Sequence, residues 1–175
     1  MSQRDSGYER KDRDLYETPE WVTDALIPHL PRHPQQVWEP ACGSGKMCQA
    51  LSRTGAYVIG SDISINNDFL AGGLPAGEWD AIITNPPYEL ATEFISHAVD
   101  LMRAKGFVAM LLRTDFDHAK TRQRLFGGCK QFAKKVVLTK RIQWFEDSKG
   151  SPSFNHAWFI WDWKHTGPPT LAYGP

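Results

Sequence analysis

The chain has 175 residues, of which 41% are hydrophobic and 23% are charged, with seven Trp among them. This is one domain of ordinary size that can bury a core, and the composition excludes a disordered chain. No stretch approaches the roughly 18 apolar residues of a membrane helix, and the N-terminus lacks the apolar core of a signal peptide. The three Cys form no CxxC pair and the six His no HExxH motif, which favours neither disulfides nor a metal. We expect a cytoplasmic protein without a membrane or metal partner.

The formal net charge of zero hides an uneven distribution along the chain. Residues 1–100 carry 7 Lys/Arg against 15 Asp/Glu, whereas residues 103–141 carry 11 against 2. A basic block of this kind is either an ordinary solvated surface or a footprint for nucleic acid. Charge alone does not distinguish the two interpretations.

The hydrophobic pattern predicts alternating strands and helices. Residues 1–14 lack apolar periodicity and are expected to be a flexible arm. Thr18 and Pro19 are typical of a helix start, and Pro31 ends that helix. Strands are expected at 37–38, 57–60, 80–84, 107–112, 135–139 and 157–163, and further helices around 47–51, 90–102 and 118–126. This alternation indicates an α/β fold with a mainly parallel sheet and helices on both faces, over one domain at 15–165 followed by a C-terminal tail at 166–175.

Three polar or glycine-rich segments each follow a predicted strand, at the sheet edge where α/β proteins bind ligands. Gly43 and Gly45 predict a turn at which the backbone passes close to a ligand. Asp62 lies 17 residues beyond Gly45, close to the spacing at which a carboxylate binds ribose hydroxyls. Together they predict an adenosine-containing cofactor.

The tetrapeptide Asn85-Pro86-Pro87-Tyr88 is the strongest signal in the chain. Two prolines after a buried strand hold the backbone extended and present the Pro86 carbonyl. This carbonyl and the Asn85 side-chain oxygen can accept both hydrogens of an exocyclic NH2 group. Tyr88 offers a flat face to the ring that bears the amine, and we expect the ring face rather than the hydroxyl to be used.

These segments resemble the S-adenosylmethionine-dependent methyltransferases, and within them the adenine-N6 amino-methyltransferases that act on DNA. The resemblance implies a Rossmann-like methyltransferase fold with a seven-stranded sheet and an antiparallel last strand. It also implies S-adenosyl-L-methionine as cofactor and direct methyl transfer to an adenine that is flipped out or single-stranded. Because little follows the strand at 157–163, we expect a compact member without a separate target-recognition domain, a size associated with phages or mobile elements.

The resemblance also assigns roles to individual residues. The catalytic residues are Asn85, Pro86, Pro87 and Tyr88. The cofactor-binding residues are Tyr16, Thr18, Pro19, Glu39, Pro40, Ala41, Gly43, Gly45, Asp62, Ile63, Asp68, Phe69 and Asn85. With nucleic acid as partner and DNA favoured, the residues expected to bind it are Arg113, Lys120, Arg122, Arg124, Lys134, Lys135, Lys140, Arg141 and Phe154, the last covering the second face of the base.

Other enzyme classes share the tetrapeptide. It is similar to the motif of enzymes that methylate a glutamine amide in translation release factors, and of RNA methyltransferases acting on adenine or guanine amines. An added N-terminal helical domain is expected for the first class and an RNA-binding module for the second, and neither is visible. A non-catalytic nucleic-acid-binding protein that keeps the fold is a third alternative, against which the intact Asn85 and Tyr88 argue.

Overall fold

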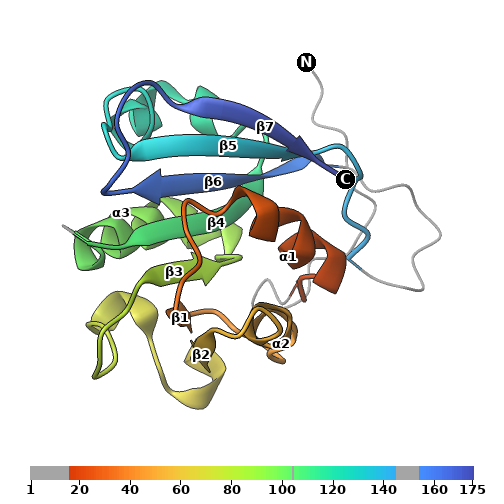
Figure 1. Ribbon diagram of the computed structural model, residues 1–175, viewed down its shortest axis with the longest axis vertical. Coiled ribbons are helices and arrows are strands. Elements are labelled where there is room, and N and C mark those ends of the chain that lie inside the picture. The colour runs from red at the N-terminus through yellow and green to blue at the C-terminus, as the bar shows by residue number, and fades with distance from the viewer. Residues whose placement is uncertain (1–15, 104, 145–153) are drawn as a thin grey trace.

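The computed structural model describes residues 16–103, 105–144 and 154–175, so the predicted arm at 1–14 lies outside the described residues. Seven strands form the sheet shown in Figure 1. The strands are β1 (Gln36–Glu39), β2 (Tyr57–Gly60), β3 (Ala81–Thr84), β4 (Phe107–Arg113), β5 (Phe132–Leu138), β6 (His156–Asp162) and β7 (Thr170–Gly174). The α-helices are α1 (Glu20–Leu26), α2 (Lys46–Ser52) and α3 (Ala91–Leu101).

The strand order across the sheet is β2-β1-β3-β4-β6-β5-β7. Neighbours are parallel except that β6 runs antiparallel to both β4 and β5. The chain passes from β1 to β2 on one side and then to β3 on the other. The order therefore reverses between β1 and β3, and ligands of α/β sheets bind at such a point.

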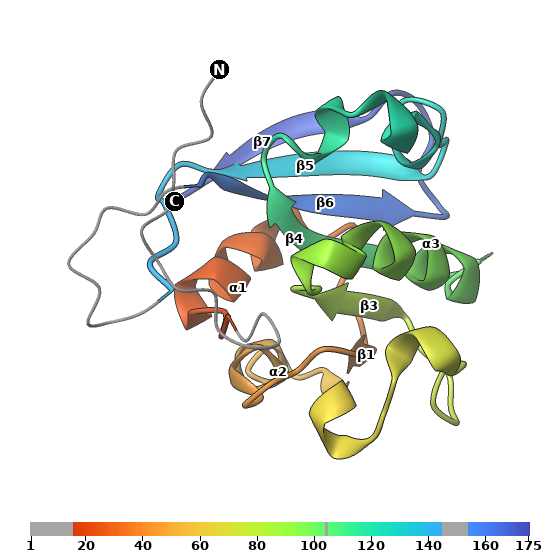
Figure 2. The ribbon, with the colours of Figure 1, turned by 180° about the vertical axis from the view of Figure 1, so that it is seen from behind.

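Alternate residues of the strands build two cores, one on each face of the sheet. Val37, Ile83 and Trp158 point toward α1 and α2. Trp38 and Ile82 point the other way, toward α3. This period of two places helices on both faces, as predicted, and Figure 2 shows α3 on the face opposite α1 and α2. The prediction of a mainly parallel α/β sheet is confirmed.

Two elements differ from the sequence-based expectation. Residues 118–126, expected to be an α-helix, lie in the short 3-10 helices Phe116–His118 and Lys120–Leu125. Leu125 is the one apolar residue of the second, so it offers no apolar stripe that would stabilise an α-helix. The prediction of a tail at 166–175 is also wrong, because Thr170–Gly174 form the strand β7, which pairs in parallel with β5. The last predicted strand, β6, is antiparallel, but one further strand follows it.

Smaller differences concern element ends. The structure begins α1 after Pro19 with no side-chain cap, so Thr18 does not cap it. Short 3-10 helices also occur at Ile27–His29, Ile63–Ile65, Phe69–Ala71 and Tyr88–Leu90. Among the described helices, none combines the length and the apolar character that crossing a membrane requires.

Removal of β7 tests its place in the sheet. A chain that ends at Pro168 loses the backbone pairing with β5 and the packing of Ala172 against the α1 face. We expect its melting temperature to fall by several degrees, since each kcal/mol is worth about 2–4 °C at this size. A chain lacking only Pro175 is the control. Equal melting temperatures of the two shortened chains, measured by circular dichroism, would show that residues 169–175 add no stability as a strand.

Candidate active site

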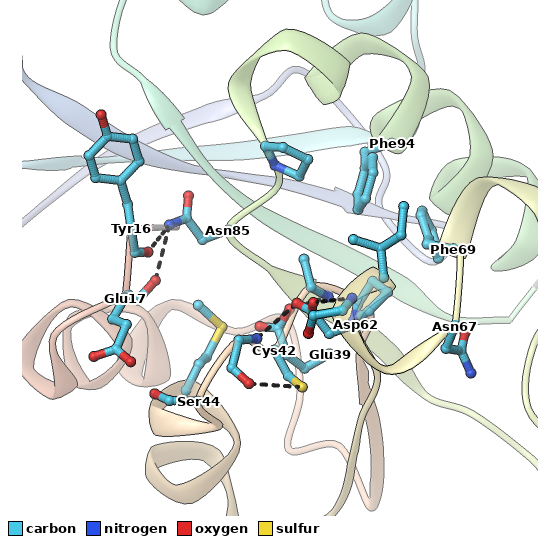
Figure 3. A pocket seen from close by; sticks show the side chains of 18 of the residues that line it. Tyr16, Glu17, Glu39, Cys42, Ser44, Asp62, Asn67, Phe69, Asn85 and Phe94 are labelled. Carbon is cyan, nitrogen blue, oxygen red and sulfur yellow. Dashed lines mark hydrogen bonds between the residues drawn. The ribbon is translucent and has the colours of Figure 1, made fainter. Parts of the chain in front are cut away.

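A pocket, called the main pocket below, lies at the carboxyl ends of β1, β2 and β3, beside the reversal of strand order. In Figure 3, Tyr16 and Asn85 stand at one end, Glu39 and Asp62 in the middle, and Phe69 at the other end. The pocket is therefore elongated, with polar groups along one part and aromatic rings at the far end. Eleven predicted cofactor residues line it: Tyr16, Thr18, Glu39, Pro40, Ala41, Gly43, Asp62, Ile63, Asp68, Phe69 and Asn85.

The glycine loop between β1 and α2 turns through two left-handed residues. Gly43 has φ of +48° and Gly45 of +86°, values that disfavour any residue with a Cβ. An added Cβ would meet no protein atom within 4 Å at either position. The backbone conformation, and not crowding by the protein, thus explains both glycines. Gly45 is the N-cap of α2 and, unlike Gly43, does not line the pocket.

Asp62 ties the end of β2 to the glycine loop. Its Oδ2 accepts a hydrogen bond from the Gly43 amide (3.0 Å) and its Oδ1 from the Ser64 amide (2.9 Å). Burial opposes ionisation, but these hydrogen bonds outweigh it, and the pKa of Asp62 lies below its usual value. Asp62 is therefore a carboxylate, and each oxygen retains acceptor capacity for a ligand hydroxyl.

Glu39 is a buried acid in the middle of the pocket, 1% exposed. Its Oε1 accepts hydrogen bonds from the Ala41 amide and the Thr84 hydroxyl, whereas Oε2 has no partner among the described residues. Burial raises the pKa of Glu39 to about 8, although both hydrogen bonds favour the carboxylate. Without a ligand this side chain is mainly protonated at neutral pH.

Asn85 has one end of its amide anchored and the other end free. Nδ2 donates to the carbonyl of Tyr16 (3.3 Å) and to Thr18 Oγ1 (3.2 Å). A carbonyl only accepts, so this contact fixes which end of the amide is the NH2 group. Within the described residues, the buried Oδ1 has no hydrogen-bond partner. Asn85 thus presents a fixed acceptor, and Thr18, which also lines the pocket, orients it.

Tyr88 makes a contact that sequence reasoning missed. Its hydroxyl lies 2.8 Å from Nε2 of His156, the first residue of β6. The expectation that only the ring face of Tyr88 is used is therefore incomplete. Tyr88 and Pro86 do not line the main pocket, whereas Asn85 and Pro87 do. The tetrapeptide thus borders the pocket with its first and third residues and turns Tyr88 away from it.

The far end of the pocket is apolar. Phe69 and Phe94 lie with ring centroids 4.7 Å apart, and Leu90 completes this part of the wall. The sequence pattern identified Leu90 and Phe94 only as core positions of a helix. The other lining residues not in the predicted sets are Glu17, Cys42, Ser44, Lys46, Met47, Ser64 and Asn67. The predicted Pro19 is not among the lining residues.

The basic block does not form one surface. Lys134 and Lys135 are consecutive in β5 and point to opposite faces. Lys135 pairs with Asp117 at 2.8 Å, with both side chains largely buried, and Lys134 donates to the carbonyl of His29. Arg122 donates to the Phe116 carbonyl and covers its ring. These three basic side chains make contacts within the fold, and their predicted binding to nucleic acid stays a prediction.

The remaining basic residues are divided between the two ends of the strands: some lie at the end that carries Asn85, and others at the opposite end. Arg113 ends β4, and its guanidinium lies 4.0 Å from the ring centroid of Phe154, so that Phe154 supports Arg113. Lys140 and Arg141 follow β5 at the same edge as Asn85 and are exposed. The segment Lys120–Leu125 runs away from this edge, because the Leu125 carbonyl accepts from Trp161 near the other end of β6. Arg124 therefore lies far from the pocket edge.

Among the described residues, no group of three or more His, Cys, Asp or Glu side chains is arranged to hold a metal ion. The described cysteines Cys42, Cys48 and Cys129 are free thiols.

The raised pKa of Glu39 predicts a pH-dependent stability. In the unfolded chain this carboxyl group ionises near pH 4.5, whereas in the folded protein it keeps its proton to about pH 8. The stability of the ligand-free protein therefore falls as pH rises from 5 to 8, because the unfolded state loses the proton first. Replacing Glu39 by Gln should remove this slope in thermal unfolding, while Glu78→Gln, at an exposed position, should not. Parallel curves for wild type and Glu39→Gln would contradict the assignment.

No model of a known protein family matches the chain. Two curated relatives are each 26% identical to it, and both are named ribosomal RNA small subunit methyltransferase C. The one from Idiomarina loihiensis aligns over 64% of this chain and 42% of its own length, and the one from Shewanella denitrificans over 60% and 39%. The chain thus matches only about two fifths of the length of these relatives.

Solved structures match most of the chain. A protein of Listeria monocytogenes assigned to the class I S-adenosylmethionine-dependent methyltransferases has a TM-score of 0.62 at 14% identity, covering 90% of this chain and 65% of its own. The modification subunit assigned to a type I restriction enzyme of Vibrio vulnificus has a TM-score of 0.58 at 14% sequence identity. The match covers 90% of this chain and 46% of the subunit. The chain has the Rossmann-like methyltransferase fold. The fold that the resemblance implied is confirmed.

Proposed function

We propose that the protein is an S-adenosylmethionine-dependent methyltransferase that methylates the exocyclic N6 amine of adenine in DNA. The observation that carries this proposal is the Asn85 amide, whose anchored NH2 group leaves a buried, unpaired Oδ1 at the end of the pocket. An unpaired buried acceptor is costly for the folded protein unless a ligand donor completes it. A planar exocyclic amine is such a donor.

The pocket residues fit the proposed cofactor. The rim carboxylate of Asp62 can accept ribose hydroxyls, and the rings of Phe69 and Phe94 form an apolar end suited to adenine. Besides the protonated Glu39, the pocket wall carries three acidic side chains that complement the ammonium and sulfonium charges of S-adenosylmethionine: Glu17, Asp62 and Asp68. Lys46, which pairs with Glu17 at 2.7 Å, adds one positive charge suited to a carboxylate.

The chemistry requires positioning rather than a strong base. When bound, S-adenosylmethionine supplies an electrophilic methyl group. Asn85 Oδ1 and the Pro86 carbonyl accept the two amine hydrogens and hold the nitrogen so that its lone pair leaves the ring plane. In such a transfer the amine nitrogen would bond to the methyl carbon as the methyl–sulfur bond breaks, S-adenosylhomocysteine would leave as a neutral thioether, and the extra proton on nitrogen would pass to water. Catalysis by orientation and fixed dipoles agrees with an Asn85 that is rigid before any substrate binds.

A second candidate acceptor is an adenine or guanine amine in RNA. The names of both curated relatives favour it, since they are ribosomal RNA methyltransferases. The likeness to a restriction-enzyme modification subunit favours DNA. Transfer of a labelled methyl group to DNA, RNA and a glutamine-containing peptide, followed by mass spectrometry of the product, tests all three. The expected product is N6-methyladenine in DNA. Labelled methyl groups found only in RNA or only in the peptide would overturn the DNA assignment.

Asn85→Ala should separate chemistry from cofactor binding. The variant lacks the fixed acceptor, and the loss of one preorganised group costs about 10²- to 10³-fold in turnover. Cofactor affinity by calorimetry should change little, because Asp62 and the glycine loop remain. Thr18→Val is the matched control, since it removes one Asn85 Nδ2 partner but leaves Oδ1 in place, and it should lose less than tenfold. Wild-type turnover in Asn85→Ala would contradict the mechanism.

The basic residues lie at two different ends of the strands, and this separation predicts which of them bind the nucleic-acid backbone. Charge reversal at Lys140 and Arg141, on the pocket edge, should weaken oligonucleotide binding and lower the slope of log affinity against log salt by about 1.4 for single strands. The same reversal at Arg124 and Lys130, toward the opposite edge, should leave both quantities unchanged. Binding titrations at several salt concentrations measure both. Equal effects of the two double variants would show that position on the sheet does not matter.

A further inference from the structure

A buried histidine lies behind the catalytic tetrapeptide and has no part in the mechanism described above. His156 is 2% exposed and begins β6, where it pairs across the sheet with Arg113 at the end of β4. Its Nε2 lies 2.8 Å from the hydroxyl of Tyr88, although 68 residues separate the two along the chain. A polar contact between two distant elements, at the edge that carries the active site, calls for a reason beyond packing.

Aromatic rings enclose this pair. The Trp144 ring meets His156 edge-on, with centroids 5.2 Å apart and planes at 84°. Tyr16, whose carbonyl holds Asn85, has its ring 5.5 Å from that of Trp144 and 6.4 Å from that of Tyr88. The rings of Tyr16, Tyr88, Trp144 and His156 thus form one cluster in which each ring contacts two others.

His156 stays neutral under ordinary conditions. Burial lowers the pKa of His156 to about 4, and the facing charge of Arg113 acts in the same direction, while the carboxylate of Asp115 opposes it. A neutral imidazole carries one N–H and one lone pair, so a hydrogen bond to a phenol persists whichever partner donates. The contact with Tyr88 is thus present throughout the neutral range.

We propose that His156 is a positioning residue that holds the Tyr88 ring in the plane on which the acceptor base stacks. This inference rests on the proposed function and deepens it. Pro86 and Pro87 restrict the backbone before Tyr88, but they leave its side-chain torsions free. The bond at the hydroxyl fixes the far end of the ring. With both ends held, Tyr88 loses little freedom when a base stacks, which favours acceptor binding.

The position of Tyr88 supports a role on the acceptor side. Tyr88 does not line the main pocket, whereas Asn85, three residues earlier, closes one end of it. The ring therefore stands outside the space assigned to the cofactor and next to the group that receives the amine. Loss of the His156 contact is expected to affect the acceptor and to leave cofactor affinity unchanged.

A double-mutant cycle tests the proposal through steady-state methyl transfer to an adenine-containing oligonucleotide. Tyr88→Phe keeps the ring but removes the hydroxyl, and His156→Phe removes the partner. Each should raise the KM for the oligonucleotide about 5- to 20-fold, with kcat changed less than threefold. The KM of the double variant should not exceed that of the more impaired single variant, because both substitutions remove the same interaction. His156→Gln, which keeps a polar atom near the Nε2 position, should restore most of the affinity.

Controls keep the outcomes distinct. Tyr173→Phe, on the exposed edge of β7, should leave KM unchanged, and calorimetry with the cofactor reports whether each variant is folded. If His156→Phe does not fold, Tyr88→Phe and His156→Gln decide the question. An unchanged KM in Tyr88→Phe, or effects that multiply in the double variant, would overturn the positioning role. Absence of transfer by the wild type to any nucleic acid would instead refute the proposed function.

Discussion

The hydrogen bond between Glu39 and Thr84 joins the two halves of the active site. It links the carboxyl ends of β1 and β3, the neighbouring strands between which the strand order reverses. The same Glu39 oxygen accepts from Ala41 in the glycine loop, and Thr84 directly precedes Asn85. One buried carboxyl group thus sets the spacing between the glycine loop and the Asn85 amide. Both partners are almost completely buried, so water does not compete for the bond.

Much of the fold and of the pocket is readable from local patterns. Short apolar runs located six of the seven strands, because both faces of the sheet are covered and neighbouring residues such as Val37 and Trp38 are both buried. Gly43 was readable because only glycine readily adopts its left-handed conformation, and Asp62 because a carboxylate after β2 comes next to that turn. These signals can be read from the sequence because the conformation of each residue depends on neighbours within a few positions along the chain.

What the sequence did not reveal depends on contacts between distant segments. His156 reads as the flank of a core strand, and only the folded chain brings it to the Tyr88 hydroxyl. Lys135 reads as part of a basic surface until the fold places Asp117 and a carbonyl around its ammonium group. β7 is short and largely exposed, so it buries too little apolar surface to leave a hydrophobic pattern. In each case the deciding partner lies far away in sequence.

The antiparallel direction of β6 has a consequence for where this fold can accept changes in sequence. Because β6 runs against its neighbours, the connection from β5 to β6 both leaves and re-enters the sheet at the edge that carries Asn85. The entropy cost of closing a loop grows only slowly with its length. Residues can therefore be inserted or exchanged between Leu138 and His156 while every strand keeps its register. Sequence changes in that connection leave in place the residues that line the pocket, all of which lie between Tyr16 and Phe94.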